Sequence, residues 1–135
     1  MGKVTLDPYL FFTGNCQEAM EFYQSVFGGE LTLNTYDEMG GEPMANMKGK
    51  IMHANLQGGD INLMASDSTR ESFGDSFISL SLSGTDEAKI RALFDKLAEG
   101  GTEVSAPKKE SWGDIFGSLT DKFGVDWMVN IGAEQ

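Results

Sequence analysis

The sequence predicts an α+β fold of two βαβββ repeats, whose curved mixed and antiparallel sheet surrounds a cavity and carries its helices on the outer face. Two observations support this prediction. A strand, a corner and a helix that stops at glycines occur over residues 9–29, and the same order returns over residues 77–101. Each copy then ends in a hairpin with a glycine turn, at Gly58-Gly59 and at Gly124. Helices mixed with short hairpins are typical of α+β domains.

The length of 135 residues predicts one domain over residues 1–135, with unit one at about 1–67 and unit two at about 76–135. A polar stretch at 66–76 separates them. A chain of this size buries about two-thirds of its unfolded surface, so it needs no disulfide or metal to hold its core together.

Charge and apolar content exclude several classes of partner. The net charge of −11 repels nucleic-acid phosphates and anionic lipid, so we expect neither nucleic acid nor membrane as a partner. No apolar run approaches the roughly 20 residues that cross a bilayer, and the first residues lack the apolar core of a signal peptide. One cysteine allows no internal disulfide. We therefore predict a cytoplasmic protein.

The first unit begins with a strand over residues 4–12, in which Pro8 indicates an edge or an irregular start. Asn15 is expected to cap the following helix, with Glu18 completing a capping box. Gly28-Gly29 ends the helix. Its apolar face is predicted to hold Ala19, Phe22, Tyr23 and Val26, bordered by Met20 and Phe27.

The rest of unit one should form a strand over 31–36, a loop over 37–50 and a hairpin over 51–65. A loop of this length is typical of a lid or of a mobile segment. Its three methionines suit a lid over an apolar ligand: Met39, Met44 and Met47.

Unit two repeats this order. Thr85 should cap a helix that ends at Gly100-Gly101 and buries an apolar stripe of Ile90, Leu93, Phe94 and Leu97. Strands are expected at residues 78–82, 102–106 (ending at Pro107), 115–120 and 125–131.

Alternation along the strands divides each sheet into two faces. One face carries aliphatic side chains and Trp127, which the helices should cover. If Gly58-Gly59 is a two-residue turn, His53 lies opposite Met64 on the other face, and Asn55 opposite Asn62. That face is either the wall of a cavity or solvated, and its methionines with Phe77 favour a cavity. It should hold His53, Asn55, Asn62, Met64, Ser79, Ser81, Asp126 and Met128.

His53 is the only histidine, so it is the candidate general base or ligand contact; the alternative is a hydrogen-bonded structural histidine. Asp126 is expected to orient His53 or bind a cation, or else to be solvated. One His with one Asp is a weak metal signal. Cys16, in the first helical turn, is either a reactive thiol or a packed side chain. Trp112 is placed to cap the cavity by stacking.

Several segments together resemble the vicinal-oxygen-chelate superfamily of glyoxalase I, bleomycin-resistance proteins and extradiol dioxygenases, and within it the PhnB-like branch. They are Pro8-Tyr9-Leu10-Phe11-Phe12, Glu18-Ala19-Met20-Glu21-Phe22-Tyr23, Phe27-Gly28-Gly29, Leu63-Met64-Ala65-Ser66-Asp67, Trp112-Gly113 and Phe123-Gly124-Val125-Asp126-Trp127. The resemblance covers nearly the whole chain. It implies a homodimer and a site inside a U-shaped sheet, often with a divalent metal. Some members carry a methyltransferase label, which no glycine-rich nucleotide turn supports here.

The resemblance places the metal ligands of its enzymes at positions that here fall on or near Pro8, Asn62, Phe77 and Met128. A first-row metal prefers imidazole or carboxylate donors, which these residues do not supply. We therefore expect no cofactor and no metal at these positions, although a divalent metal held by another set of residues stays an alternative.

The residues and the resemblance together predict a protein that binds a small molecule in its sheet cavity, and the resemblance implies that it is a homodimer. The alternative is an enzyme of the same superfamily, a lyase, isomerase or dioxygenase type that uses a metal or His53. A third interpretation is an interaction protein with a vestigial cavity. The candidate ligand-binding residues are His53, Asn55, Asn62, Met64, Phe77, Ser79, Trp112, Asp126 and Met128.

Overall fold

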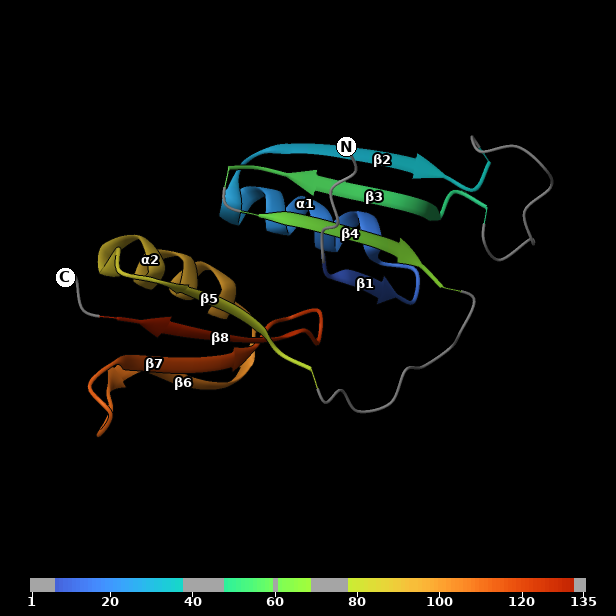
Figure 1. Cartoon of the computed structure of the whole chain (residues 1–135). Coiled ribbons are helices and arrows are strands. Elements are labelled where there is room, and N and C mark those ends of the chain that lie inside the picture. The colour runs from blue at the N-terminus through green and yellow to red at the C-terminus, as the bar shows by residue number, and fades with distance from the viewer. Residues whose placement is uncertain (1–6, 38–47, 60, 69–77, 133–135) are drawn as a thin grey trace. The chain divides into compact units, whose positions relative to one another are not determined.

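The computed structural model describes residues 7–37, 48–59, 61–68 and 78–132. They belong to two units, Met1–Phe73 and Gly74–Gln135 (Figure 1). Unit one contains β1 (Tyr9–Phe12), α1 (Cys16–Phe27), β2 (Glu30–Thr35), β3 (Ile51–Gln57) and β4 (Asn62–Asp67). Unit two contains β5 (Leu80–Gly84), α2 (Glu87–Ala98), β6 (Thr102–Lys109), β7 (Ile115–Thr120) and β8 (Asp126–Ile131).

The two units have the same topology. Their strand orders are β1-β4-β3-β2 and β5-β8-β7-β6. In each sheet the first strand pairs in parallel with the last, and the other pairs are antiparallel. Two mixed four-stranded sheets with one helix each confirm the predicted α+β fold of two βαβββ repeats.

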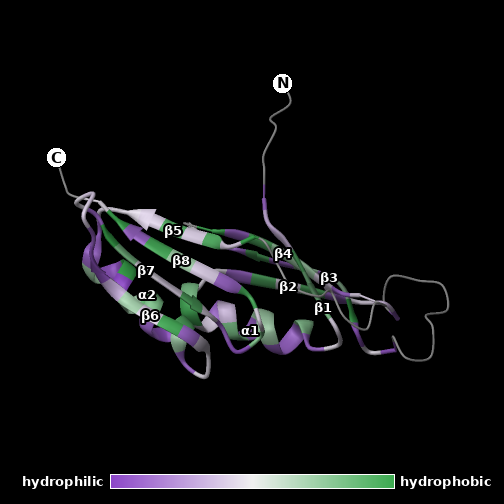
Figure 2. Cartoon of the chain, turned by 90° about the horizontal axis from the view of Figure 1, so that it is seen from below, coloured by the Kyte–Doolittle hydropathy of each residue, from purple (hydrophilic) through white to green (hydrophobic). Residues whose placement is uncertain are grey.

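Each helix covers one face of its own sheet. The buried residues of α1 are Cys16, Ala19, Met20, Tyr23 and Val26, and those of α2 are Ile90, Phe94 and Leu97. Phe22 and Leu93, predicted in the apolar stripes, are only half-buried. Both helices are amphipathic, as the alternation of hydrophobic and hydrophilic segments along them shows (Figure 2). Of the helices among the described residues, none is sufficiently long and apolar to span a bilayer.

The corner between β1 and α1 is organised by Asp67, which is 1% exposed. Its Oδ1 accepts hydrogen bonds from the backbone N–H groups of Gly14 and Cys16, each at 2.9 Å. Its Oδ2 accepts from the backbone N–H of Ile51 at 3.0 Å. The side chain of Asn15 makes no capping hydrogen bond, so the predicted capping box is wrong. A carboxylate 51 residues away from Cys16 binds its backbone N–H instead.

The second helix is capped one residue later than predicted. The Oδ1 atom of Asp86, and not the side chain of Thr85, accepts a hydrogen bond from the backbone N–H of Lys89 at 3.1 Å. Asp86 is the residue directly before α2, where a carboxylate is a preferred cap. The glycine stop is confirmed, because Gly100 follows α2 with φ of 73°.

The hairpin between β3 and β4 differs from its predicted register. Gln57 pairs with Asn62 and Asn55 with Met64, because the turn contains four residues rather than two. The backbone N–H of Gly58 donates to the carbonyl of Ile61 at 3.0 Å across this turn. A shift by two residues keeps every side chain on the same face of the sheet, so the predicted assignment of side chains to the two faces remains correct. β4 also continues through Asp67, into the stretch assigned to the boundary.

Strand β6 runs past Pro107 to Lys109, where the sequence predicted its end. Pro107 is tolerated because β6 is an edge strand of its sheet. The pairing of β6 with β7 has two register shifts, between Thr102 and Ser105 and between Ser105 and Lys108. Gly117 on β7 lies so close to Pro107 that a Cβ atom there would be 2.9 Å from the proline nitrogen.

The β7–β8 hairpin is held by a second buried carboxylate, Asp121. Its Oδ1 accepts from the backbone N–H groups of Phe123 and Val125 at 2.8 and 3.0 Å. Its Oδ2 accepts from the indole Nε1 of Trp127 at 2.8 Å. The core position predicted for Trp127 is confirmed, since it is buried.

Replacing Trp127 with Phe removes the indole N–H donor from Asp121 while keeping an aromatic ring. We expect Trp127→Phe to lower the free energy of unfolding by about 1.5–3 kcal/mol, the range for one hydrogen bond to a charged group. The matched control is Trp112→Phe, because Trp112 is 62% exposed and such a change should cost less than about 0.5 kcal/mol. Urea denaturation followed by far-ultraviolet circular dichroism measures both, and equal effects would contradict the structural role of this bond.

Some predictions concern residues outside the described part of the chain. They are residues 4–6 of the first strand, the methionines Met39, Met44 and Met47 of the long loop, and Phe77.

Candidate functional site

The face of the unit-one sheet opposite α1 carries four of the nine predicted site residues. Along β3 and β4 the side chains of His53, Asn55, Asn62 and Met64 are half-buried, and they alternate with the buried Ala54, Leu56, Leu63 and Ala65. The register places Tyr9 on β1 next to Met64, and Phe11 next to Ser66. This surface, which we call the open face of unit one, therefore combines amide, imidazole, thioether and aromatic groups.

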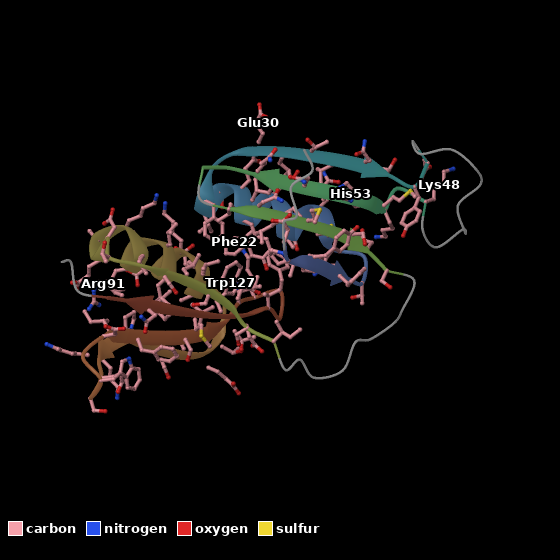
Figure 3. The ribbon with its side chains drawn as sticks, viewed as in Figure 1. Phe22, Glu30, Lys48, His53, Arg91 and Trp127 are labelled. Atoms are coloured by element: carbon pink, nitrogen blue, oxygen red, sulfur yellow. The ribbon has the colours of Figure 1, made fainter. Side chains whose placement is uncertain are left out.

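The aromatic part of the open face is a cluster of Tyr9, Phe11 and His53. Tyr9 is 38% exposed and Phe11 55% exposed, and their ring centroids lie 5.0 Å apart. The ring of His53, which Figure 3 labels on β3, lies 6.0 Å from that of Tyr9. The Oη atom of Tyr9 and the Nδ1 atom of His53 are 3.4 Å apart. Since β4 separates β1 from β3, the Tyr9 side chain spans β4 to reach His53.

Exposed apolar side chains that lie together within a polar rim are typical of sites that contact a ligand or another protein. Rings at this separation in a tilted arrangement support one another, which fixes a surface on which a flat molecule can stack. The imidazole of His53 adds a group that donates or accepts hydrogen bonds according to its tautomer. The cluster can thus bind a flat molecule and recognise one polar group on it.

Asn62 lies at the beginning of β4 on the same face. Its Oδ1 atom is buried and has no hydrogen-bond partner, and among the described residues it is the one buried side-chain polar atom in this condition.

In unit two the corresponding face is polar. Met128 pairs with Ser81 and Ser118, and Thr120 pairs with Asp126, to whose Oδ1 its hydroxyl donates a hydrogen bond at 2.7 Å. Ser79 is exposed and precedes β5. These positions confirm that Ser81, Asp126 and Met128 share a face opposite α2.

Trp112 lies in the turn between β6 and β7. The turn is closed by two backbone hydrogen bonds, from Glu110 to the carbonyl of Asp114 at 2.8 Å and from Gly113 to that of Glu110 at 3.0 Å. The Trp112 ring contacts Phe116 edge-on with centroids 6.2 Å apart. The exposed indole of Trp112 therefore lies on a turn that is held by backbone hydrogen bonds and by the contact with Phe116.

Cys16 does not have the surroundings of a reactive thiol. It is fully buried, and burial followed by the neighbouring charge of Asp67 raises the pKa of its thiol to about 12. The structure therefore supports the packing interpretation. The N-terminus of a helix favours the thiolate and lowers a thiol pKa. Here burial and the charge of Asp67 raise the pKa by more than the helix lowers it.

The structure brings His53, Asn55, Asn62 and Met64 together in unit one, and Ser81, Asp126 and Met128 in unit two. Among the residues that the structure describes, no three His, Cys, Asp or Glu side chains cluster in a way that would hold a metal ion. Sequence reasoning missed Tyr9 and Phe11 as site residues. Their alternate positions in Tyr9-Leu10-Phe11-Phe12 are the signal, but four apolar residues in a row hide which pair faces outward.

The chain is similar in sequence and in structure to several other proteins. A family model described as 3-demethylubiquinone-9 3-methyltransferase matches residues 4–130. The protein PA1353 from Pseudomonas aeruginosa is 38% identical with a TM-score of 0.84, and the match covers 98% of this chain and 100% of that one. A PhnB protein from Bacillus cereus with the same family description is 28% identical with a TM-score of 0.74, covering 96% and 100%.

The fold is also shared with more distant proteins. A bleomycin-binding protein, solved in complex with bleomycin, is 17% identical with a TM-score of 0.61, and the match covers 96% of this chain and 99% of that protein. This similarity shows the glyoxalase and bleomycin-resistance fold that the sequence motifs predicted.

Proposed function

Because the chain belongs to the family described as 3-demethylubiquinone-9 3-methyltransferase, the PhnB-like branch of the glyoxalase and bleomycin-resistance fold, we propose that it binds a small organic molecule on the open face of unit one. The observation that carries the proposal is the cluster of Tyr9, Phe11 and His53, in which two exposed rings and an imidazole adjoin. The bleomycin complex of a protein with this fold supports small-molecule binding as a function of the architecture.

We propose that binding uses no metal at the positions expected from the resemblance. Pro8 offers only a backbone carbonyl, which already accepts a hydrogen bond from the N–H of Met64 at 3.2 Å. Asn62 offers an amide oxygen and Met128 a thioether. This donor set does not fit a first-row divalent cation, which takes imidazole and carboxylate ligands. Phe77 lies outside the described residues.

Methyl transfer, which the family description names, is not part of the proposal. The described strands form two mixed four-stranded sheets, whereas a glycine-rich nucleotide turn opens a helix of a parallel, doubly wound sheet. Binding by stacking needs only the residues present on the open face.

We expect a flat aromatic probe, indole, to bind the wild-type protein and to perturb the backbone amide resonances of β1, β3 and β4 in an NMR titration. Tyr9→Ala should raise the dissociation constant for indole about tenfold, because the tyrosine ring supplies both buried contact area and stacking. Met52→Ala is the control, because Met52 is exposed on β3 outside the cluster. Unchanged indole affinity in Tyr9→Ala would refute the aromatic cluster as the site.

Native mass spectrometry of the freshly purified protein tests the remaining parts of the proposal together. The homodimer should appear as twice the mass of 14.7 kDa, a resident ligand as an added organic mass, and bound metal as an added metal mass. Stoichiometric metal would overturn the metal-free proposal.

A second candidate function is acid–base catalysis by His53, favoured by the 3.4 Å contact between Tyr9 Oη and Nδ1. That contact orients the ring and leaves the other ring nitrogen for a substrate. A co-purified ligand whose mass or NMR spectrum changes in the wild type but not in His53→Gln would support catalysis; an unchanged mass and an unchanged NMR spectrum in both support binding alone.

A further inference from the structure

We propose that the Oδ1 atom of Asn62 accepts a hydrogen bond from the ligand, so that the ligand class is a flat aromatic molecule with an N–H or O–H group on its edge. This inference rests on the proposed function and specifies its ligand. The observation behind it is the buried, unpartnered Oδ1 atom. Buried polar atoms in native proteins are nearly always paired, so an exception calls for an explanation by a group that binds there.

The neighbouring strands explain why the protein itself leaves this atom unpaired. On the β1 side the chain passes Pro8, whose carbonyl is bonded to the N–H of Met64 and which has no N–H group to donate. On the other side the register partner of Asn62 is Gln57, whose side chain is exposed. The acceptor thus has no donor from its own fold, and because the atom is buried, a ligand has to displace a neighbouring side chain to reach it.

The position of Asn62 relative to the aromatic cluster sets the size of the ligand. Met64, two residues further along β4, is the register partner of Tyr9. Side chains two residues apart on one face of a strand are separated by about 7 Å, which is the long dimension of a two-ring aromatic molecule. A ring system resting on Tyr9 and Met64 therefore brings an edge substituent to Asn62.

The chemistry of the acceptor selects the substituent. An amide oxygen accepts hydrogen bonds and carries no charge, so it favours a neutral N–H or O–H donor over an ether, a carbonyl or an anion. A site with a buried acceptor discriminates strongly against an analogue that lacks the donor, because the acceptor then stays unpaired.

The test compares indole, which has one N–H donor, with N-methylindole, which has the same flat ring system and no donor. Dissociation constants are measured by NMR titration with the full-length protein. The wild type should prefer indole by about tenfold, the factor expected for one buried hydrogen bond. The extra methyl group of N-methylindole adds apolar area, so hydrophobic contact alone would give the opposite order.

Asn62→Leu should remove the preference for indole, whereas Asn62→Asp, which keeps acceptor oxygens at this position, should retain it. Asn34→Leu is the matched control: it makes the same change on the same sheet face, in edge strand β2, and should keep the preference. The unfolding temperature of Asn62→Leu should equal or exceed that of the wild type, because the substitution removes an unpaired buried atom.

The outcomes are distinguishable. Equal affinity of the wild type for both compounds, or a preference for N-methylindole, overturns the role of Asn62 and leaves small-molecule binding standing. No binding of either compound overturns the aromatic ligand class and the proposed function with it. A destabilised Asn62→Leu protein also counts against the inference, because the amide would then have a structural partner.

Discussion

Replacing Asp67 with Ala should lower the free energy of unfolding by about 3–5 kcal/mol, because three backbone N–H groups lose their common acceptor inside the protein. These donors belong to Gly14, Cys16 and Ile51, and they connect the corner before α1 with the start of β3. The buried carboxylate thus joins three segments that are far apart in the sequence. Only an acceptor side chain of the same length could accept the same hydrogen bonds at this position.

The experiment is urea denaturation followed by far-ultraviolet circular dichroism. Asp67→Asn should be intermediate, because the amide keeps one oxygen for Gly14 and Cys16 but turns an N–H₂ group toward the N–H of Ile51. Asp95→Ala is the control, because Asp95 is exposed on α2. If Asp67→Ala were within about 1 kcal/mol of the wild type, the corner would not depend on this carboxylate.

The location of the tryptophans makes the same experiment more informative. Both Trp112 and Trp127 belong to unit two, whereas Asp67 belongs to unit one. Tryptophan fluorescence therefore reports on unit two, and circular dichroism on both. A parallel shift of both signals in Asp67→Ala indicates that the two units unfold together.

The thiol of Cys16 should react with a disulfide reagent about a thousand times more slowly in the native protein than in the chain unfolded in guanidinium. Only the thiolate reacts, and an ordinary cysteine with pKa of about 8.5 is partly ionised at pH 8. With a pKa of about 12, Cys16 is almost entirely protonated at that pH. Because the chain has one cysteine, the absorbance of the released thiol reports on this residue alone.

A control variant carries Cys16→Ala together with Gln17→Cys, which moves the thiol by one position to an exposed site of the same helical turn. Its native reaction should be fast. Native Cys16 reacting within tenfold of the unfolded rate would contradict its burial.

The raised pKa also predicts how alkali affects stability. Above about pH 8.5 the unfolded thiol loses its proton, while the folded thiol retains it up to about pH 12. The folded state then binds more protons than the unfolded state, so this residue lowers stability as pH rises through that interval. The wild type should lose stability with rising pH more steeply than Cys16→Ala.

Most of the architecture could be predicted because it depends on short-range patterns. Glycines at 28–29 and 100–101 end the helices, and alternation sets the faces of the strands. The predictions that were wrong concern features that depend on residues far apart in the sequence. The cap of α1 comes from Asp67, and Pro107 lies within β6 because that strand is at an edge, neither of which a local pattern reveals.

The candidate site was predicted in part for the same reason. Faces depend only on parity, so His53, Asn55, Asn62 and Met64 were placed together although the hairpin register was wrong by two residues. Tyr9 and Phe11 join them through the parallel pairing of β1 with β4, which connects segments more than fifty residues apart. The unpaired state of Asn62 Oδ1 needs three-dimensional packing and has no signature in the sequence.

The irregular edge strand β6 has a consequence for self-association. A second chain that added itself to β6 would find no N–H at Pro107 and would have to follow two breaks in register. Such an edge is a poor template for sheet extension. We therefore expect β6 to resist the strand-by-strand growth that leads to fibrils, although most of its residues are exposed to solvent.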